Sequence, residues 1–360
     1  MQLPVDVGYS NRMSDPTKSE PPGISRTSIF VAAGRALGAR EPDPAARNPD
    51  YLAEKLLGDP STLGLDHPAV RALSLSYDEA LKDVEVASNV RMMIVRTRFI
   101  DEALERAVAG GATQVVILGA GFDSHAYRCL DLLAHARVFE VDRHATQAVK
   151  KQRVNEVLGP PPANLTYVEI DFRQEDLRDV LIRHGYDPEQ RTFFIWEGVT
   201  MYLPEAAVRD TLRFVASHPP GSGIVFDFVY RAMIEMIARI DMANIPAAAR
   251  PFVQRFIDLT RNEPWVFGIP VDGERAFLGD FGLELREAMM IGGEDSLRRY
   301  ATKADGTQVG AQAMAEAMAR MRERMQAQPA FQSQMSPERL REQQRLQAYQ
   351  LAEAVVPPRS

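Results

Sequence analysis

Hydrophobic residues recur at helical spacing over the first part of the chain. Two stripes are present: Ile29, Ala32, Ala33 and Ala36, then Val90, Met93, Ile94, Thr97 and Ile100. Residues three and four positions apart share one face of a helix, so each stripe predicts an amphipathic helix. We expect residues 23–110 to form an N-terminal helical extension. Residues 1–22 are polar and contain prolines, and we expect them to form a disordered tail.

At Gly110-Gly111 the helical spacing of the hydrophobic residues ends. Short apolar runs rich in β-branched and aromatic residues now alternate with amphipathic helices, a pattern typical of βαβ units and a parallel sheet. Five runs predict strands: Val115–Leu118, Val138–Val141, Leu165–Ile170, Thr192–Trp196 and Ile224–Val229. The alternation predicts an α/β fold, a Rossmann-like, doubly wound and mostly parallel sheet of seven strands.

The pattern after Tyr230 predicts additions to this sheet. A helical insertion at about 231–265 carries Met233, Met236, Ile237 and Ile240 at core-facing spacing. Further strands are predicted at Leu283–Ile291 and Leu346–Val356, with a helix at Asp295–Ala301. Between them, a second insertion at about 303–345 contains the helix Ala311–Gln328, whose methionines at 314, 318, 321 and 325 form a stripe. Residues 111–356 are therefore expected to be one domain with two helical insertions.

Composition narrows the class of protein. The chain is 45% hydrophobic and 25% charged, as expected of a globular protein with a large core. Its net charge of −7 argues against a nucleic-acid partner, because binding phosphate backbones usually requires a basic face. The single cysteine, Cys129, cannot form an internal disulfide, and no apolar run is long enough to span a bilayer. We expect a cytoplasmic protein with no membrane partner.

The candidate chemistry follows the ends of the predicted strands. Gly119 and Gly121 form a glycine turn after the first strand, where a ligand can approach the backbone. The next three strands are followed by Asp142, Asp171 and Glu197. In an open parallel sheet these positions border the ligand crevice, and an acid after the second strand suits the hydroxyls of a ribose. Three carboxylates would repel a pyrophosphate, so a cationic adenosine cofactor, S-adenosylmethionine, fits better than a dinucleotide.

Several motifs resemble the leucine carboxyl methyltransferase-like branch of class I S-adenosylmethionine-dependent methyltransferases, in particular its bacterial small-molecule and polyketide O-methyltransferases. The motifs are Leu118-Gly119-Ala120-Gly121-Phe122-Asp123-Ser124, Phe139-Glu140-Val141-Asp142, Trp196-Glu197-Gly198-Val199-Thr200-Met201-Tyr202-Leu203 and Arg96-Thr97-Arg98-Phe99-Ile100-Asp101. The chain also resembles bacterial members at Ser25-Arg26-Thr27, Arg35-Ala36-Leu37, Asp171-Phe172-Arg173 and Ala352-Glu353-Ala354-Val355-Val356-Pro357. The resemblance covers residues 25 to 303 and the last strand.

The resemblance implies roles for individual residues. Gly119 and Gly121 would face the methionine part of the cofactor, and Asp142 would bind the ribose hydroxyls. Asp171 and Phe172 would contact the adenine. Many members of the family have leucine at the position of Phe172. Arg96 would pair with the cofactor carboxylate, with Arg98 as the alternative, and Glu197 would lie near the ammonium group.

The reaction itself favours one class of acceptor. A carboxylate has an ordinary pKa of about 4 and is already an anion at neutral pH, whereas a phenol, with a pKa of about 10, needs a base. No histidine matches a catalytic position; His125 and His144 are expected to be surface or structural residues. We therefore expect carboxyl O-methylation without a general base and without a metal. Methylation of a phenolic or enolic hydroxyl and a non-catalytic adenosine-binding protein remain the alternatives.

The acceptor site is expected beyond the strand ends, where Met201, Tyr202, Tyr230 and Trp265 are candidate lining residues. The methionine stripes are either core packing or an adaptable apolar lid. A lid of this kind would suit a largely apolar small molecule from secondary metabolism. The 314–325 stripe also leaves a homodimer open.

Overall fold

The computed structural model describes residues 25–170, 175–243, 245, 250–260, 264–326 and 349–358. The N-terminal part of this chain is helical. Its elements are α1 (Arg26–Ala39), α2 (Ala53–Leu57), η1 (Pro60–Thr62), α3 (Pro68–Arg71), η2 (Ala72–Ser74), α4 (Tyr77–Ala80) and α5 (Val84–Ala109). Asp83 caps α5 by accepting a hydrogen bond from the backbone N–H of Glu85, at 2.8 Å. Both predicted apolar stripes are buried, on α1 and α5.

The remaining elements build one seven-stranded sheet with its covering helices. The strands are β1 (Gln114–Leu118), β2 (Arg137–Asp142), β3 (Leu165–Glu169), β4 (Thr192–Trp196), β5 (Gly223–Phe228), β6 (Glu284–Met290) and β7 (Gln350–Val355). The helices are α6 (His125–Arg128), α7 (His144–Val157), α8 (Leu177–Arg183), η3 (Thr200–Tyr202), α9 (Glu205–Ala216), α10 (Arg231–Ala238), α11 (Arg250–Thr260), α12 (Glu274–Gly279), α13 (Glu294–Tyr300) and α14 (Ala311–Gln326).

The strand order is β3-β2-β1-β4-β5-β7-β6. The first five strands are parallel, and β7 pairs antiparallel with both β5 and β6. The chain therefore has the predicted mostly parallel, doubly wound sheet. The order changes direction at β1 and β4, so their carboxyl ends border the crevice where ligands bind in such sheets.

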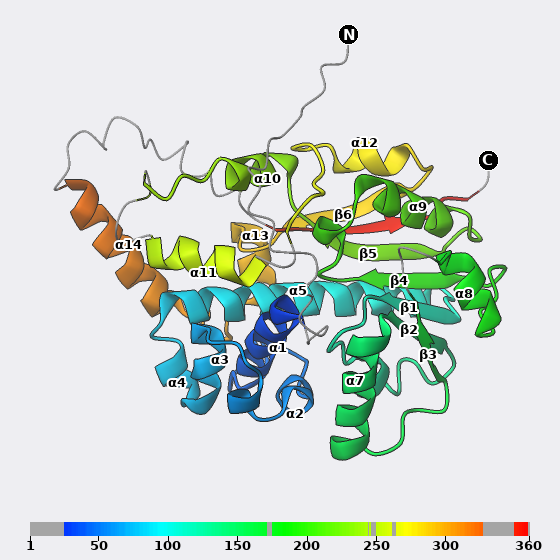
Figure 1. Ribbon diagram of the computed structural model, residues 1–360, viewed down its shortest axis with the longest axis horizontal. Coiled ribbons are helices and arrows are strands. Elements are labelled where there is room, and N and C mark those ends of the chain that lie inside the picture. Colours follow the sequence, from blue (N-terminus) through cyan, green and yellow to red (C-terminus); the bar gives the residue numbers. More distant parts are fainter. Residues whose placement is uncertain are drawn as a thin grey trace, which may run out of the picture.

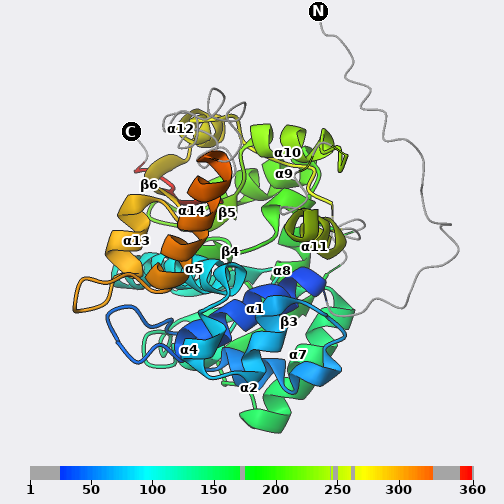
Figure 2. The same ribbon diagram turned by 90° about the vertical axis from the view of Figure 1, so that its left-hand side faces the viewer.

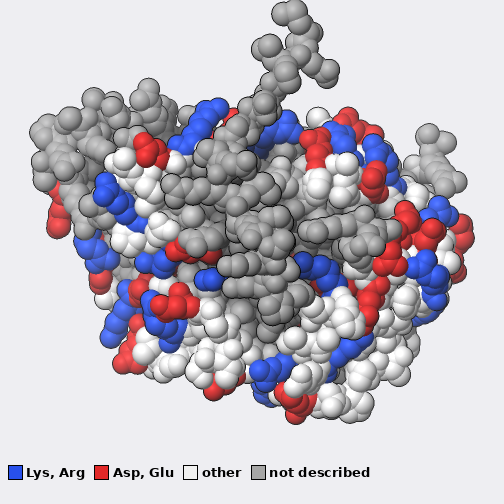
Figure 3. Space-filling model, viewed as in Figure 1, with Lys and Arg blue, Asp and Glu red and all other residues white. Residues whose placement is uncertain are grey.

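Alternating residues of the strands pack against different helices. Val115 and Ile117 belong to a core shared with α1 and α5, whereas Val116 and Leu118 belong to a core shared with α9 and α12. Figure 1 shows α5 along one face of the sheet and α9 and α12 over the other. In the view of Figure 3, basic and acidic side chains are interspersed over the described surface. No described helix is long and apolar enough to cross a membrane.

The two insertions are less buried than their apolar stripes suggested. No residue of α10 is fully buried, and Met236 is 36% exposed. On α14, Ala313 is buried and Met314 half-buried, but Met318 is 55% exposed, so the stripe is not a core face along its length. The helix α11 lies between α1 and α10 (Figure 2). The predicted tail at 1–22 and residues 327–348 lie outside the described residues, and the division of the chain into parts stays a prediction.

Candidate active site

The glycine turn after β1 is packed tightly against the segment that follows β4. Gly119 has φ +67°, and a Cβ built on it would lie 2.5 Å from Cγ2 of Val199. Its backbone N–H donates to the carbonyl of Val141 at 2.8 Å. Gly121 also has a positive φ, of +42°. A side chain at Gly119 would displace Val199, so the close approach of the two loops requires glycine.

Asp142, the last residue of β2, holds this turn through backbone hydrogen bonds. Its Oδ2 accepts from the N–H of Gly121 at 2.6 Å, and its Oδ1 accepts from the N–H of Arg143 at 2.7 Å. Burial raises the pKa of the carboxyl, and these two N–H groups oppose that rise. A carboxylate has about four acceptor positions, so Asp142 keeps capacity for further donors.

Arg96 lies at the centre of a buried group of charges. Its Nε is 2.9 Å from Oε1 of Glu197, directly after β4, and its Nη2 is 3.2 Å from Oδ2 of Asp227 on β5. Nη1 of Arg35, on α1, lies 3.5 Å from the same Glu197 oxygen. These four residues, Arg35, Arg96, Glu197 and Asp227, form the Arg96 cluster. It brings together α1, α5 and the ends of β4 and β5.

The charges of the Arg96 cluster are paired, but several of its atoms are not hydrogen-bonded. Within the described ranges, four buried atoms have no hydrogen-bond partner in suitable geometry: Nε of Arg35, Nε of Arg96, Oε1 of Glu197 and Oδ2 of Asp227. Burial opposes the charge on Arg96, yet Asp227 and Glu197 raise its pKa; burial raises the pKa of Asp227. Buried polar atoms are normally satisfied, so this group is suited to binding a ligand with charges of both signs.

Arg35 connects the N-terminal helix α1 to the glycine turn. Its Nη2 donates to the carbonyl of Phe122 at 3.0 Å, and its Nε is 3.3 Å from Oδ2 of Asp50. The other oxygen of Asp50 accepts from the hydroxyl of Ser124 at 2.6 Å. The extension is thus part of the site. Sequence reasoning assigned no role to Arg35 or Asp227, although the motif containing Arg35 was noted.

The structure distinguishes the two candidate arginines. The Arg98 side chain points away from the Arg96 cluster, since its Nη1 donates to the carbonyl of Ala45 at 2.6 Å. Arg96, in contrast, contacts Glu197. Asp171 and Phe172, the predicted adenine contacts, lie outside the described residues.

The two histidines have separate environments. His125 is 2% exposed, with Nδ1 2.7 Å from Asp123 and Nε2 2.9 Å from Asp101. Burial disfavours the imidazolium, but the two acids raise the pKa of His125 to about 9. His144 is largely exposed and pairs with Glu169 at 2.7 Å. Both nitrogens of His125 are bound to carboxylates, so the ring has a structural role: it connects Asp101 of α5 to Asp123 after β1.

Three of the four predicted acceptor residues lie near one another. Met201 and Trp265 are buried in one apolar cluster, against which Tyr202, Phe256 and Tyr349 pack together with Met233, Ile234 and Ile237 of α10. We call this set the aromatic cluster. Tyr230 belongs instead to the core on one face of the sheet, with its ring 5.9 Å from that of Phe228. Tyr349 was not predicted, because no motif surrounds it in the sequence.

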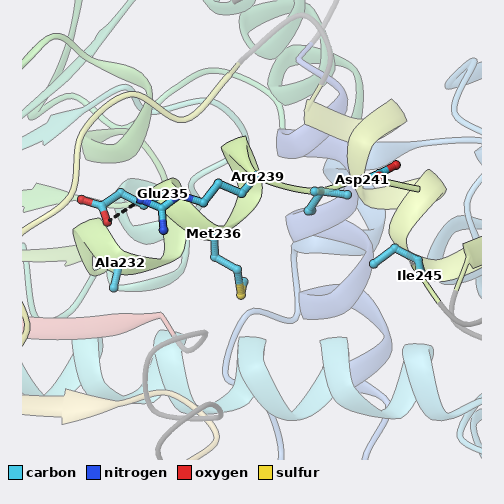
Figure 4. Close-up of a pocket in the computed structure, with 7 residues that line it drawn as sticks. Ala232, Glu235, Met236, Arg239, Asp241 and Ile245 are labelled. Carbon is cyan, nitrogen blue, oxygen red and sulfur yellow. Dashed lines mark ion pairs between the residues drawn. The ribbon is translucent and has the colours of Figure 1, made fainter. Parts of the chain in front are cut away.

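A pocket of about 490 Å³ lies against another face of α10 and the segment after it. Figure 4 shows its lining side chains, among them Met236 and Ile245, with Glu235 and Arg239 joined as an ion pair. None of the predicted site residues lines this pocket. Within the described ranges, no group of three or more His, Cys, Asp or Glu is placed to hold a metal ion.

Comparison with known proteins identifies the family. The family model described as leucine carboxyl methyltransferase matches residues 28–216, just over half of the chain. The chain belongs to the leucine carboxyl methyltransferase family. The matched range includes Arg35, Arg96, Asp142 and Glu197 and ends before Asp227 and Trp265.

Individual relatives are similar over a large part of the chain. A protein of Frankia alni, named "Putative S-adenosyl-L-methionine-dependent methyltransferase", is 36% identical over 55% of this chain. The match spans 66% of that relative, just under two thirds of its length. A Mycolicibacterium vanbaalenii protein of the same description is 33% identical, over 60% of this chain and 70% of the relative. The predicted family is confirmed, and the relatives' names give the predicted enzyme class and cofactor.

A crystal structure of a "putative methyltransferase" from Thermobifida fusca is similar to the chain, with 16% identity and a TM-score of 0.47 over 97% of this chain and all of that one.

Proposed function

We propose that the protein transfers a methyl group from S-adenosylmethionine to the carboxylate of a largely apolar small molecule, which gives a methyl ester. The observation that carries the proposal is the Arg96 cluster, whose buried charges lie beside a glycine turn and a ribose-type aspartate. Family membership supports the reaction class. The choice of acceptor rests on the chemistry of the site.

The described residues fit the cofactor. The unsatisfied atoms of Arg96 and Glu197 match a group that carries a carboxylate and an ammonium. In the proposed arrangement Arg96 binds the carboxylate, Glu197 the ammonium and Asp142 the ribose hydroxyls. Gly119 and Gly121 leave the backbone accessible to the methionine part. Asp171 and Phe172 are proposed as adenine contacts from the family resemblance alone.

The protein's contribution to the reaction is positioning. When bound, S-adenosylmethionine supplies a methyl carbon on a sulfonium; as an acceptor oxygen bonds to that carbon, the carbon–sulfur bond breaks and its electron pair returns to sulfur. In-line displacement is accelerated by holding the two reacting atoms about 3 Å apart in alignment. In this proposal the Arg96 cluster and the glycine turn hold the methyl donor, and the aromatic cluster next to them holds the acceptor.

The absence of an available base in the described site supports a carboxylate acceptor. His125 is bound on both nitrogens, and Oδ1 of Asp227 accepts from the N–H of Gly198 at 2.7 Å while its Oδ2 pairs with Arg96. A carboxylate needs no deprotonation near neutral pH, whereas a phenol does. The apolar character of the aromatic cluster supports an acceptor with few polar groups.

The decisive experiment transfers labelled methyl from S-adenosylmethionine to a metabolite extract with the purified protein. We expect a labelled product that releases methanol in mild base, as a methyl ester does. A base-stable product would replace our proposal with methylation of a phenol or enol. Binding of S-adenosylhomocysteine in a calorimeter without turnover on any extract would favour the non-catalytic alternative, and no binding would remove the proposed function altogether.

A further inference from the structure

The indole N–H of Trp265 is buried and has no partner among the described residues. Trp265 is 7% exposed, and its Nε1 forms no hydrogen bond with any part of the chain that the structure describes. Buried tryptophan N–H groups usually find an acceptor, because leaving such a donor unsatisfied in an apolar environment is costly. Unlike the unsatisfied atoms of the Arg96 cluster, this one has no ion-pair partner. Its position therefore calls for a functional explanation.

Aromatic side chains from distant parts of the chain hold the indole in place. Phe256 of α11 and Tyr349 before β7 each meet the Trp265 ring edge to face, with centroids 5.3 Å apart and planes at 83° and 81°. Met201 and Val229 complete the buried part of this cluster. Edge-to-face contacts of this geometry are favourable, so the ring orientation is well determined.

The Trp265 segment is joined to the site of methyl transfer. The backbone N–H groups of Val266 and Phe267 donate to the carbonyl of Met201, at 2.8 and 3.2 Å, and Met201 lies four residues after Glu197. The hydroxyl of Thr200, between them, donates to the carbonyl of Asp227 at 2.6 Å. Trp265 is thus attached to the loop that carries Glu197.

Tyr349 provides a second connection between the indole and the Arg96 cluster. Burial raises the pKa of its phenol well above the ordinary value; Tyr202 and Asp227 raise it further, whereas Arg96 opposes them. The same ring contacts Trp265. The backbone bonds to Met201 and the ring contact with Tyr349 therefore attach the indole to segments next to the Arg96 cluster.

We propose that the indole N–H of Trp265 donates a hydrogen bond to the carboxyl group of the methyl acceptor, and that this acceptor is an aromatic or alkyl monocarboxylic acid. This inference rests on the proposed function and adds to it the specificity-determining residue and the substrate class. Trp265 lies beyond the range that the family model matches, so family membership assigns it no role.

The apolar surroundings of the indole explain why the proposed acceptor has a single polar group, its carboxyl group. The side chains from α10 that pack on the cluster are Met233, Ile234 and Ile237. Each polar group of an acceptor loses its hydration on entering such a site, which is unfavourable unless a partner is present. A single N–H can satisfy one carboxyl oxygen, whereas a sugar or peptide would bring groups that remain unpaired. Methionine side chains can adapt to different apolar skeletons.

Nuclear magnetic resonance can test the contact directly, because the chain contains two tryptophans, Trp196 and Trp265. The 15N-labelled protein, saturated with S-adenosylhomocysteine, would be titrated with 2-naphthoate, with 2-methylnaphthalene as the matched compound without a carboxylate. The indole signal missing from Trp265→Phe belongs to Trp265. We expect naphthoate to shift its proton downfield and leave the Trp196 signal in place, whereas methylnaphthalene produces no downfield shift.

Calorimetry on Trp265→Phe separates loss of the hydrogen bond to the acceptor from a general disturbance of packing in the site. Trp265→Phe removes a donor that has no partner in the free protein, so we expect weaker naphthoate binding by about tenfold and unchanged S-adenosylhomocysteine affinity. A Trp265 signal that does not move, or a variant that binds naphthoate as the wild type does, would overturn the inference. Failure of S-adenosylhomocysteine to bind the wild type would instead count against the proposed function itself.

Discussion

Asp142 shows how one side chain can serve both the fold and a ligand. Its two oxygens accept from the backbone N–H groups of Gly121 and Arg143, which fixes the turn after β1. The acceptor positions that these donors leave unused are those that ribose hydroxyls would take in the proposed function. Removing the carboxylate should therefore affect binding more than a loss of charge alone would.

Asp142→Ala should weaken S-adenosylhomocysteine binding by about 1–3 kcal/mol, the cost of losing hydrogen bonds to a charged group. The measurement is an isothermal titration at constant ionic strength. Glu169→Gln is the matched control, since Glu169 also ends a strand but pairs with exposed His144 and Lys151. Equal affinities for the wild type and Asp142→Ala would remove the ribose assignment.

His125 makes the stability of the protein dependent on pH. The acids beside it raise its pKa from 6.5 to about 9, so the folded protein binds the imidazolium proton more tightly than the unfolded chain does. This contribution is complete below pH 6.5 and is lost as the pH rises through about 9. At 1.36 kcal/mol per pKa unit it amounts to about 3 kcal/mol.

Urea unfolding of the wild type and His125→Gln at several pH values measures this contribution as a difference. The difference in unfolding free energy should be largest near pH 6 and should decrease towards pH 9.5. Subtracting the variant also cancels the titration of Glu140, whose pKa burial raises to about 7. A difference that stays constant over this range would show that the pKa of His125 is the same in the folded and the unfolded protein.

The sequence identified some site residues and missed others for a physical reason. Arg96, Gly119, Asp142 and Glu197 stand in recognisable motifs or directly after predicted strands. Asp227 lies inside the apolar run of β5, where nothing local marks it as a partner of Arg96. That pairing depends on the order of strands in the sheet, which is set by contacts between residues far apart in the chain.

At the scale of elements, the helical pattern gave the positions of the insertions but not their degree of burial. The predicted helix at Ala311–Gln328 is α14, at Ala311–Gln326. Periodicity shows that a helix has an apolar face, yet it contains no information about whether another element covers that face. Met318 is 55% exposed for this reason, whereas the nearby Ala313 is buried.

An ion pair joins the helix α11 to the N-terminal extension. Arg255 of α11 donates to Glu85 in the first turn of α5, and Glu85 also lies 3.2 Å from Nε2 of His67. The Arg255 side chain is 35% exposed and that of Glu85 13%, so solvent screens the pair only in part. This contact holds the helix that carries Phe256 against α5.

Arg255→Gln should loosen α11 locally without unfolding the protein. Partly exposed ion pairs contribute about 0.5–1 kcal/mol, which corresponds to a roughly two- to fivefold increase in hydrogen exchange of the α11 amides. Exchange is read by mass spectrometry on peptides covering 250–260. Arg239→Gln, which removes an exposed pair with Glu235, is the control and should leave those peptides unchanged. No change in the Arg255 variant would mean that packing alone holds α11.

For the whole molecule, β7 connects parts that are far apart in sequence. It pairs with β5 and β6, and Glu353 within it is buried and accepts hydrogen bonds from Arg106 of α5. Arg286 of β6 lies 3.4 Å from the other oxygen of Glu353. One side chain thus joins the helical extension to the sheet.

Glu353→Gln should destabilise the whole protein by about 1–3 kcal/mol, because it replaces charge-assisted hydrogen bonds in a buried position. Urea unfolding followed by circular dichroism should show one transition at a lower midpoint, with the extension and the sheet unfolding together. Exposed Glu205→Gln, which loses a surface pair with Arg209, should have little effect. Two separate transitions in the variant would show that the extension folds independently of the sheet.

The central place of β7 also has a consequence for biosynthesis. The chain emerges from the ribosome in sequence order, so β5 and β6 are made before the strand that must lie between them. Until residues 350–355 have been synthesised, the apolar edge of β5 has no neighbour on that side and can pair with other chains. The nascent protein should therefore depend on chaperones between the synthesis of β5 and that of β7.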